Sequence, residues 1–441
     1  MNPTQVVGPN RLKISPAARL RGEITVPGDK SISHRSVIFN SVADGTAQVT
    51  NFLPGEDCLS SIACMRAMGV NIQFNEYARS VTVEGRGLHG LQESSEILNA
   101  GNSGTTTRLL TGLLSGQNFY SVLTGDDSLR SRPMGRVIKP LKFMGAQIWG
   151  RKNDSFAPLA IRGSQLKGIE YSLPVASAQL KSCLLLAALY ATSPTRLTGL
   201  IDSRDHTERM LKAMGAPLKV SADEIVMNGP ATRLLAQNVE VPGDISSAAF
   251  WLVLASVHPD ADLTLLNVGV NPTRTGIIDA LGEMGADITL SQEREIAGEP
   301  VANLRVKSAS LRGAGIGGNI IPRLVDEIPA LGVAALFAQG TSRVSDAAEL
   351  RVKETDRIAT LSSELDRLGA TVEPHPDGMT IKGGAKLKGG YVKSYSDHRL
   401  AMSLAILGLL LPSGETLEIE DYKCADVSYP GFWEDLAKIA N

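Results

Sequence analysis

Short amphipathic segments that end in a glycine recur along the chain. Apolar residues three or four apart precede each glycine, and alternating apolar and polar residues follow it. This pattern predicts a helix closed by a glycine and then a strand. The spacing of roughly 70 to 85 residues is typical of an internal repeat, and the five glycines are Gly69, Gly145, Gly215, Gly285 and Gly369.

A second recurring unit lies between these segments. A polar turn rich in glycine or serine is followed by a helix of small apolar residues, a short turn and a strand-like segment. The helices are apolar on nearly every side, so we expect them to form the interior of the fold. Six such units are present, and their turns begin at Pro27, Gly101, Ala176, Pro242, Asp326 and Ser396.

The fourth unit opens almost as the first does, with VPGDISSAAF against VPGDKSISHR. This likeness, in a chain of 441 residues, predicts an α/β protein with two domains of three units each. We expect one domain at residues 27–241. The other is expected to comprise residues 1–26 and 242–441, with a strand at Leu12–Leu20 closing it.

The composition is that of a globular protein, with 43% hydrophobic and 20% charged residues and a formal net charge of −2. The near-zero charge argues against a general nucleic-acid-binding surface. The longest apolar stretch, Leu404–Leu411, is too short to cross a bilayer, and the polar N-terminus lacks the features of a signal or transit peptide. We therefore expect a cytoplasmic protein without membrane or nucleic-acid partners.

The four cysteines and six histidines are scattered without the spacing of a metal site. We interpret the cysteines as small buried side chains in a reducing compartment. No metal and no organic cofactor is expected.

The polar turns carry the candidate chemistry, because a helix N-terminus attracts phosphate or carboxylate. Gly28–Arg35 places Lys30 and Arg35 at one helix start, and Gly101–Arg108 is a glycine-rich turn without the Gly-Lys-Ser/Thr of an ATP-type phosphate loop. Two arginines precede Pro133. Taken singly, each feature is also consistent with ordinary turn geometry or with solvated charge.

The densest charged segment is Glu349–Arg357. If it is helical, Lys353, Asp356 and Arg357 share one face, and Glu354 is placed to pair with Arg357. Such a stripe is often only a solvated surface. However, Asp326-Glu327 and Asp397-His398-Arg399 occupy the turns of neighbouring units, so that basic residues for two anions and carboxylates for proton transfer are available.

These motifs identify a family resemblance over essentially the whole chain. PGDKSISHR, GNSGTTTR, LRSRP, SAQLKS, VDEIPALGVAALFAQG, LRVKETDR and SDHRLAMS occur in the order found in 5-enolpyruvylshikimate-3-phosphate synthases. The resemblance implies a two-domain inside-out α/β barrel with three βαβαββ repeats per domain and pseudo-threefold symmetry. The active site would lie in the cleft between the domains. The implied reaction transfers the enolpyruvyl group of phosphoenolpyruvate to the 5-hydroxyl of shikimate 3-phosphate, with no cofactor.

The resemblance also implies roles for individual residues. Asp326 and Glu354 would be the acid–base pair, assisted by Lys30. Shikimate 3-phosphate would be bound by Lys30, Ser31, Arg35, Ser177, Ala178, Gln179, Ser203, Arg204, Asp326 and Lys353. Phosphoenolpyruvate would be bound by Lys30, Gly104, Arg132, Gln179, Arg357 and Arg399.

The sequence departs from the better-known form of this family at several positions. Glu349 stands where asparagine is frequent, His206 where an aromatic residue is common, and Ser103 and Leu109 replace alanine and proline. The tail Cys424–Val427 lacks a lysine near phosphoenolpyruvate. These changes resemble the divergent second class of the family and leave sensitivity to the inhibitor glyphosate open.

Three alternatives are kept. The related transferase acting on UDP-N-acetylglucosamine shares the fold, but here the loop Gly125–Arg132 lacks its usual cysteine, with Asp126 or Asp127 as the possible replacement. The repeats could instead form a non-catalytic clamp for phosphorylated metabolites, or an RNA-end-processing enzyme. We expect a monomer, because both halves belong to one chain.

Overall fold

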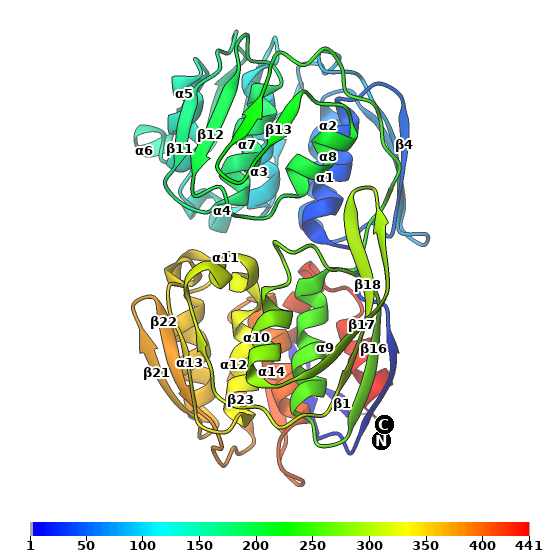
Figure 1. Ribbon diagram of the computed structural model, residues 1–441, viewed down its shortest axis with the longest axis vertical. Helices are drawn as coiled ribbons and strands as arrows, with labels where there is room; N and C mark the ends of the chain where they lie inside the picture. The colour runs from blue at the N-terminus through cyan, green and yellow to red at the C-terminus, as the bar shows by residue number, and fades with distance from the viewer. Residues whose placement is uncertain (1–2, 441) are drawn as a thin grey trace. The chain divides into compact units, whose positions relative to one another are not determined.

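A computed structural model describes residues 3–440 of the chain (Figure 1), so the ends of the predicted first domain, residues 1, 2 and 441, lie outside it. The chain divides into two compact units. Unit 1 contains the N-terminal segment up to Pro27, Pro242–Arg294 and the segment from Pro300 onward, and unit 2 contains Gly28–Val241 and Glu295–Glu299. The short segment Glu295–Glu299, which the sequence analysis assigned to the other domain, packs with unit 2.

Each unit contains three four-stranded sheets of one topology. In unit 2, β7 (Leu98–Asn99) pairs in parallel with β8 (Tyr120–Thr124), which pairs antiparallel with β10 (Phe156–Arg162), and β10 pairs antiparallel with β9 (Gln147–Gly150). Helices α3 (Gly104–Ser115) and α5 (Gly135–Phe143) connect these strands. The repeat is therefore βαβαββ, with the short helices α4 (Asp127–Ser131) and α6 (Arg151–Asp154) added.

The other two sheets of unit 2 follow the same order. One contains β11 (Glu170–Leu173), β12 (Thr195–Gly199), β14 (Ile225–Met227) and β13 (Leu218–Val220), with α7 (Ala178–Ala188) and α8 (His206–Ala213). The other contains β15 (Val239–Glu240), β4 (Thr46–Thr50), β6 (Ser80–Glu84) and β5 (Asn71–Asn75), with α1 (Lys30–Ser41) and α2 (Glu56–Ala67). Its first strand, β15, comes from the far end of the unit and closes the repeat.

Unit 1 is closed by its N-terminal strands. Its first sheet contains β3 (Leu20–Ile24), β16 (Ala261–Gly269), β18 (Glu299–Lys307) and β17 (Asp287–Ile296), with α9 (Ile245–Val257) and α10 (Gly276–Met284). Its second contains β19 (Gly315–Ile316), β20 (Thr341–Val344), β22 (Gly378–Lys382) and β21 (Thr371–His375), with α11 (Ile321–Leu324), α12 (Ile328–Phe337) and α13 (Arg357–Arg367). Its third contains β23 (Gly390–Lys393), β24 (Leu417–Glu420), β2 (Arg11–Ile14) and β1 (Thr4–Gly8), with α14 (His398–Leu409), and α15 (Phe432–Ile439) follows.

The single strand expected at Leu12–Leu20 is wrong. The segment forms two strands, β2 and β3, which join different sheets of unit 1. Pro16 lies between them, and proline cannot donate a ladder hydrogen bond. The break lets one short stretch of chain complete two repeats.

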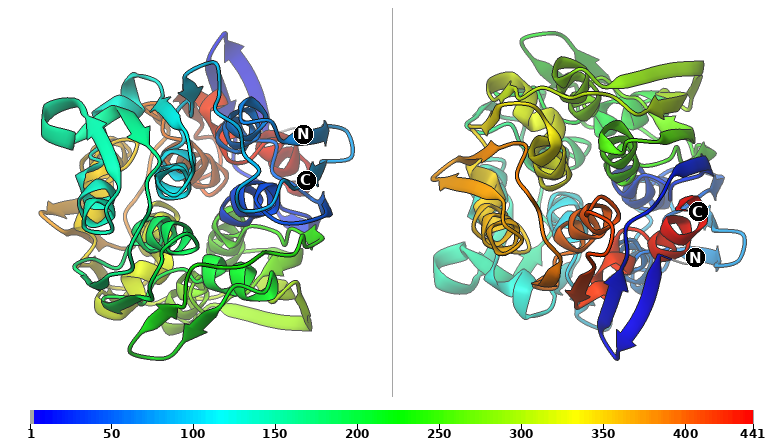
Figure 2. Two further views of the ribbon diagram at one scale, coloured as in Figure 1. Left: turned by 90° about the horizontal axis from the view of Figure 1, so that it is seen from above. Right: turned by 90° about the horizontal axis from the view of Figure 1, so that it is seen from below.

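The six apolar helices lie inside the units, as their sequences predict. In Figure 2 the sheets of each unit surround its central helices, and α9, α12 and α14 pack against one another in unit 1. In unit 2, Gly112 of α3 allows a close approach to α7, since a Cβ there would lie 2.1 Å from the Cys183 carbonyl oxygen. This packing fixes the N-termini of α3 and α7 relative to each other.

The glycine-closed helices are also confirmed. Gly69, Gly145, Gly215, Gly285 and Gly369 all have φ between 86° and 96°, the left-handed region that glycine enters without steric cost. Strands β5, β9, β13, β17 and β21 begin a few residues later. The repeat read from the sequence is therefore a structural repeat.

The segment Glu349–Arg357 is not one helix, the case considered for its charges. Ala348–Val352 forms a 3-10 turn, Lys353 is extended, and α13 begins only at Arg357. Asp356 caps that helix, with its side chain accepting from the Ala359 N–H at 3.0 Å. An aspartate that bonds to nearby backbone favours a helix start over a helix interior. Consequently Lys353 and Arg357 reach Asp326 from two sides of a turn.

Candidate active site

Five of the six buried helices begin with a side-chain cap. The capping side chains, each accepting a backbone N–H of the first turn, are Asp29, Ser103, Ser177, Asp244 and Asp397. Capping fixes these helix starts, and the remaining N–H groups of the first turn supply partial positive charge. Several of the predicted site residues lie in the first turns of these helices, namely Lys30, Ser31, Gly104, Ala178, Gln179 and Arg399.

Two arginines converge on the start of α3. A Cβ at Gly104 would lie 2.8 Å from one terminal nitrogen of Arg108 and 3.6 Å from one of Arg132, so a side chain here would displace the Arg108 guanidinium and contact that of Arg132. Arg132 is oriented by Asn102, whose Oδ1 accepts from it at 2.5 Å. Two guanidinium groups beside a helix N-terminus favour a bound anion.

Gln179 belongs to the same group. Its Oε1 accepts from Arg108 at 2.5 Å, and its Nε2 donates to Thr105 Oγ1 at 3.1 Å. Ser177 caps α7 and Ala178 is its first residue. The structure thus brings together Gly104, Arg132 and Gln179, three of the predicted phosphoenolpyruvate residues.

A buried chain of hydroxyl groups supports the glycine turn. Ser103 Oγ accepts from Thr106 Oγ1 at 2.7 Å, Thr106 bonds to Ser61 at 2.7 Å, and Ser61 bonds to His34 Nδ1 at 2.8 Å. Burial lowers the pKa of His34 to about 3, so the imidazole is neutral. The serine at position 103, a departure from the family pattern, is therefore linked through Thr106 and Ser61 to His34 of α1.

Lys30 is the first residue of α1 and is half-buried. Its Nζ lies 2.5 Å from Asp57 Oδ2 at the start of α2. The ion pair holds the amine near the helix ends, but it also means that a substrate anion must share the lysine with Asp57. Ser31 follows Lys30 on α1, and its carbonyl accepts from Arg35 at 2.9 Å.

Arg35 is 3% exposed and is held by protein groups. Its Nε donates to Thr207 Oγ1 at 2.7 Å, and a terminal nitrogen donates to Ser182 Oγ at 2.8 Å. Burial lowers the pKa of Arg35 to about 10, and nearby Arg204 contributes to the lowering. Arg35 thus joins α1, α7 and α8, and its direct contact with substrate stays a prediction.

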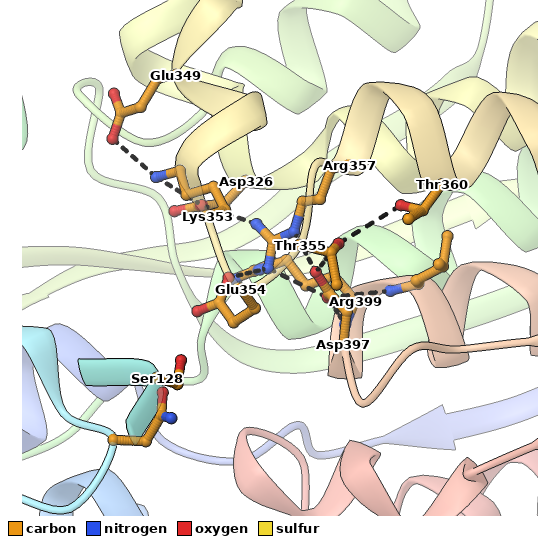
Figure 3. Close-up of polar contacts among 12 residues, drawn as sticks. Ser128, Asp326, Glu349, Lys353, Glu354, Thr355, Arg357, Thr360, Asp397 and Arg399 are labelled. Atoms are coloured by element: carbon orange, nitrogen blue, oxygen red, sulfur yellow. Dashed lines mark hydrogen bonds and ion pairs between the residues drawn. The ribbon is translucent and has the colours of Figure 1, made fainter. Parts of the chain in front are cut away.

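Arg357 organises the carboxylates of unit 1 (Figure 3). Its guanidinium lies 2.6 Å from Glu354 Oε2, 2.8 Å from Asp397 Oδ2 and 3.5 Å from Asp326 Oδ1. The arginine is 1% exposed and Asp397 is fully buried. The terminal nitrogen that faces Asp326 is buried without a hydrogen-bond partner among the described residues, so it remains a donor for an anion.

These charges fix one another's protonation. Burial lowers the pKa of Arg357, but the carboxylates of Asp397, Glu354 and Asp326 raise it above its ordinary value. Burial raises the pKa of Asp397, but Arg357 and His398 lower it by more, so that the net pKa is below the usual range. The arginine is therefore cationic and Asp397 is ionised at neutral pH.

Asp326 lies between two cations. Lys353 Nζ is 3.3 Å from its Oδ1, and Lys353 also contacts Glu349 at 2.9 Å. Glu349, which replaces an asparagine of the better-known form, thus pairs with a predicted substrate-binding lysine. Arg399 is the second residue of α14, with its backbone N–H bonded to Asp397 at 2.9 Å. The Arg399 side chain is half-buried.

His206 does not present an open aromatic face. It is 2% exposed, and its Nδ1 bonds to Glu299 Oε1 at 2.8 Å, while the neighbouring Arg209 donates to the Gly298 carbonyl at 2.9 Å. These bonds explain why the tip Glu295–Glu299 of the β17–β18 hairpin packs with unit 2.

Sequence reasoning did not predict the partners of several residues in these clusters. Arg108 follows Gly104 by four residues on one helix face, a spacing that could have revealed it. Asp397 stands in the capping position before α14, a signal for a helix start but not for an arginine partner. Asp57 has no recognisable signal, since only the tertiary fold brings it to Lys30.

The structure places the cysteines and histidines whose spacing the sequence left unexplained by a metal site. Cys58, Cys64 and Cys183 are free and buried, as expected, whereas Cys424 is only partly buried. Within residues 3–440, no three histidine, cysteine or carboxylate side chains are grouped as metal ligands. No helix of the described residues is long and apolar enough to cross a membrane.

Comparisons with known proteins decide the family. The family model described as EPSP synthase (3-phosphoshikimate 1-carboxyvinyltransferase) matches residues 14–436. The chain belongs to the EPSP synthase family. A 3-phosphoshikimate 1-carboxyvinyltransferase of Herpetosiphon aurantiacus is 57% identical over 428 residues, covering 97% of this chain and 98% of that protein. One of Desulforudis audaxviator is 54% identical over 421 residues, covering 96% and 97%.

Similarity to solved structures agrees with this family assignment. An EPSP synthase from Acinetobacter baumannii superposes with a TM-score of 0.88 at 44% identity, covering 98% of both chains. The enolpyruvyl transferase NikO from Streptomyces tendae has a TM-score of 0.80 at 17% identity, covering 98% of this chain and 97% of that one, which shows the fold alone. The enolpyruvyl transferase fold expected from the sequence is confirmed. The interpretations as a non-catalytic clamp, an RNA-end-processing enzyme or a UDP-N-acetylglucosamine transferase are not favoured.

Proposed function

We propose that this protein transfers the enolpyruvyl group of phosphoenolpyruvate to the 5-hydroxyl of shikimate 3-phosphate and releases phosphate. The observation that carries the proposal is the cluster of Asp326, Glu354 and Arg357 in a chain of the EPSP synthase family. The cluster combines two partly exposed carboxylates with a fixed cation, which suits proton transfer beside an anionic substrate.

The reaction needs two opposite proton transfers. In the first step the 5-hydroxyl oxygen bonds to C2 of phosphoenolpyruvate while the hydroxyl loses its proton and the methylene carbon gains one. In the second step the methyl carbon loses a proton and the C2–O bond to phosphate breaks. Asp326, which lies between Lys353 and Arg357, accepts the hydroxyl proton, and Glu354 delivers and later removes the proton at carbon.

Water solvates the anionic groups of both substrates in solution, and cations of the protein must take over this role in the site. We assign phosphoenolpyruvate to Lys30, Gly104, Arg132, Gln179, Arg357 and Arg399. Shikimate 3-phosphate is assigned to Lys30, Ser31, Arg35, Ser177, Ala178, Gln179, Ser203, Arg204, Asp326 and Lys353. Support comes from the paired arginines at Gly104 in unit 2 and from the unused donor of Arg357 in unit 1.

Phosphorus NMR of the purified protein with both substrates tests the assignment. The expected result is the loss of the phosphoenolpyruvate signal, the appearance of inorganic phosphate, and a new phosphomonoester that mass spectrometry identifies as the enolpyruvyl ether of shikimate 3-phosphate. Consumption of phosphoenolpyruvate with UDP-N-acetylglucosamine, and none with shikimate 3-phosphate, would instead establish the related transferase.

The finer assignments are also proposals. We place the protein in the divergent second class, supported by Ser103, His206 and Glu349, each of which has a partner of its own in this structure. A resemblance to that class in its response to glyphosate is tested by inhibition kinetics against phosphoenolpyruvate. A monomer in the cytoplasm is proposed as well. Sedimentation at several concentrations and cell fractionation test these two points, and a concentration-independent dimer or recovery with membranes would overturn them.

A further inference from the structure

Lys181 is a buried cation that the proposed mechanism does not use. It lies in α7, two residues after Gln179, and is 1% exposed. A lysine is rarely buried this completely unless its charge and its three donors are satisfied.

All three donors of Lys181 have acceptors. Its Nζ lies 2.6 Å from Glu208 Oε1 in α8, 3.0 Å from the Ile201 carbonyl oxygen and 3.1 Å from the Ser203 carbonyl oxygen. Because an ammonium has three N–H bonds, no donor remains for a substrate. Lys181 therefore acts on other groups of the protein.

The two carbonyls belong to an irregular segment, Leu200–Asp205, which connects β12 to α8. Its Leu200 N–H still bonds to the Leu173 carbonyl of β11 at 3.1 Å, but the next backbone bonds are short-range turns, from Ile201 N–H to the Gly199 carbonyl and from Ser203 N–H to the Ile201 carbonyl, each 2.8 Å. Beyond Leu200 neither a helix nor a strand fixes the segment, and the bonds from Lys181 to the Ile201 and Ser203 carbonyls tie it to α7.

This segment carries Ser203 and Arg204, two of the residues assigned to shikimate 3-phosphate. The hydroxyl of Ser203 is buried and has no hydrogen-bond partner among the described residues. Arg204 lies close enough to Arg35 to lower its pKa. A buried, unmatched hydroxyl on the residue that precedes Arg204 is suited to a phosphate oxygen.

We propose that Lys181 is a positioning residue for the phosphate of shikimate 3-phosphate. It holds the backbone of Ile201 and Ser203 so that Ser203 and Arg204 face the bound phosphate, and Glu208 balances its charge. The inference rests on the proposed function and adds a residue to the acceptor-binding half of the site. It predicts a loss confined to shikimate 3-phosphate, because the contacts of Arg132 and Gln179 do not involve Lys181.

The variant Lys181→Met keeps the length of the side chain and removes the donors. We expect the Kd of shikimate 3-phosphate, measured by calorimetry without phosphoenolpyruvate, to rise about 10- to 100-fold through loss of ordered phosphate contacts. The KM of phosphoenolpyruvate at saturating acceptor should change less than about threefold. A folded Lys181→Met protein whose Kd for shikimate 3-phosphate stays within about twofold of wild type would overturn the proposal.

A second variant separates positioning from charge balance. Lys181→Met alone leaves Glu208 buried without its cation, which can prevent folding. The double variant Lys181→Met/Glu208→Met removes both charges, and we expect it to fold while retaining the defect for shikimate 3-phosphate. Recovery of wild-type affinity in the double variant would show that Lys181 serves only to neutralise Glu208, and the positioning role would be wrong.

A matched control is Lys142→Met, which removes another lysine–carboxylate pair of unit 2, with Asp154. It should leave both substrate affinities unchanged. Failure of the proposed function is distinguishable from failure of the inference, because in the first case wild-type protein neither binds nor turns over shikimate 3-phosphate. In the second, wild type does both and Lys181→Met does so equally well.

Discussion

Asp397→Asn tests how unit 1 holds the Arg357 cluster. The aspartate is fully buried and accepts from Arg357 Nε at 2.8 Å and from Thr355 Oγ1 at 3.1 Å. It also caps α14 through the N–H groups of Arg399 and Leu400. Asparagine preserves the shape and can still cap, but it lacks the charge that opposes Arg357.

The structure sets the size of the expected effect. Breaking a buried ion pair costs about 3–5 kcal/mol when the partner is left uncompensated. Glu354 and Asp326 remain beside Arg357, and asparagine keeps part of the cap, so we expect the free energy of unfolding to fall by about 2–4 kcal/mol at pH 7. Urea unfolding followed by the fluorescence of Trp251, buried in the core of unit 1, measures it.

The pH dependence of this loss of unfolding free energy gives the sign of the contribution from the Asp397 charge. The pKa of Asp397 is lower in the folded protein than in the unfolded chain, where it is about 3.9. Its contribution is therefore fully present above that unfolded value and is lost as the pH falls through the folded pKa. The difference between wild type and Asp397→Asn should be constant from about pH 5 to pH 8 and shrink below about pH 4.

The control is Asp356→Asn, which changes another helix-capping aspartate of unit 1. Asp356 pairs with Arg351 at 2.7 Å, but its side chain is 37% exposed. An exposed pair contributes about 0–1 kcal/mol, so the control should cost less than about 1 kcal/mol. A loss below about 1 kcal/mol for Asp397→Asn as well, or one that persists unchanged at pH 3, would refute the argument that the buried charge stabilises this cluster.

Three further changes follow from the site. Glu354→Gln should lower kcat roughly 10²- to 10⁴-fold, the usual contribution of general acid–base catalysis, while the Kd of shikimate 3-phosphate changes little; unchanged turnover in steady-state assays would remove Glu354 from the mechanism. Gly104→Ala places a methyl group 2.8 Å from Arg108, so the KM of phosphoenolpyruvate should rise roughly tenfold with little loss of thermal stability, and an unaltered KM would argue against an anion at this turn. Burial raises the pKa of Cys64 and Cys183 to about 12, so a disulfide reagent at pH 8 should leave both thiols unmodified until urea is added, as peptide mapping would show; rapid labelling of either in the folded protein would contradict their burial.

The repeat architecture was predictable because it rests on local signals. A glycine such as Gly285 ends a helix by adopting the left-handed conformation, and an all-apolar helix such as α9 can only be buried. Both signals lie within about 15 residues of sequence and recur in each repeat. Sequence order alone also predicted that the N-terminal segment joins the later repeats, although not that Pro16 divides it.

Only those residues of the site that belong to recognisable sequence motifs could be predicted. Gly104, Arg132 and Gln179 were named from separate motifs, and the structure brings them together through Arg108. Helical spacing would put Lys353 and Arg357 on one face of a single helix, but Asp356 caps a helix that begins only at Arg357. Pairs such as Lys30 with Asp57 depend on tertiary packing, which no local pattern encodes.

Phosphate release from phosphoenolpyruvate tests the central claim most directly. Purified protein is assayed with shikimate 3-phosphate, with unphosphorylated shikimate and with UDP-N-acetylglucosamine as separate acceptors, and with Glu354→Gln alongside wild type. The account predicts rapid release by wild type with shikimate 3-phosphate alone, and little release by the variant. Release that needs the UDP-sugar, or that is equally fast in the variant, would contradict it.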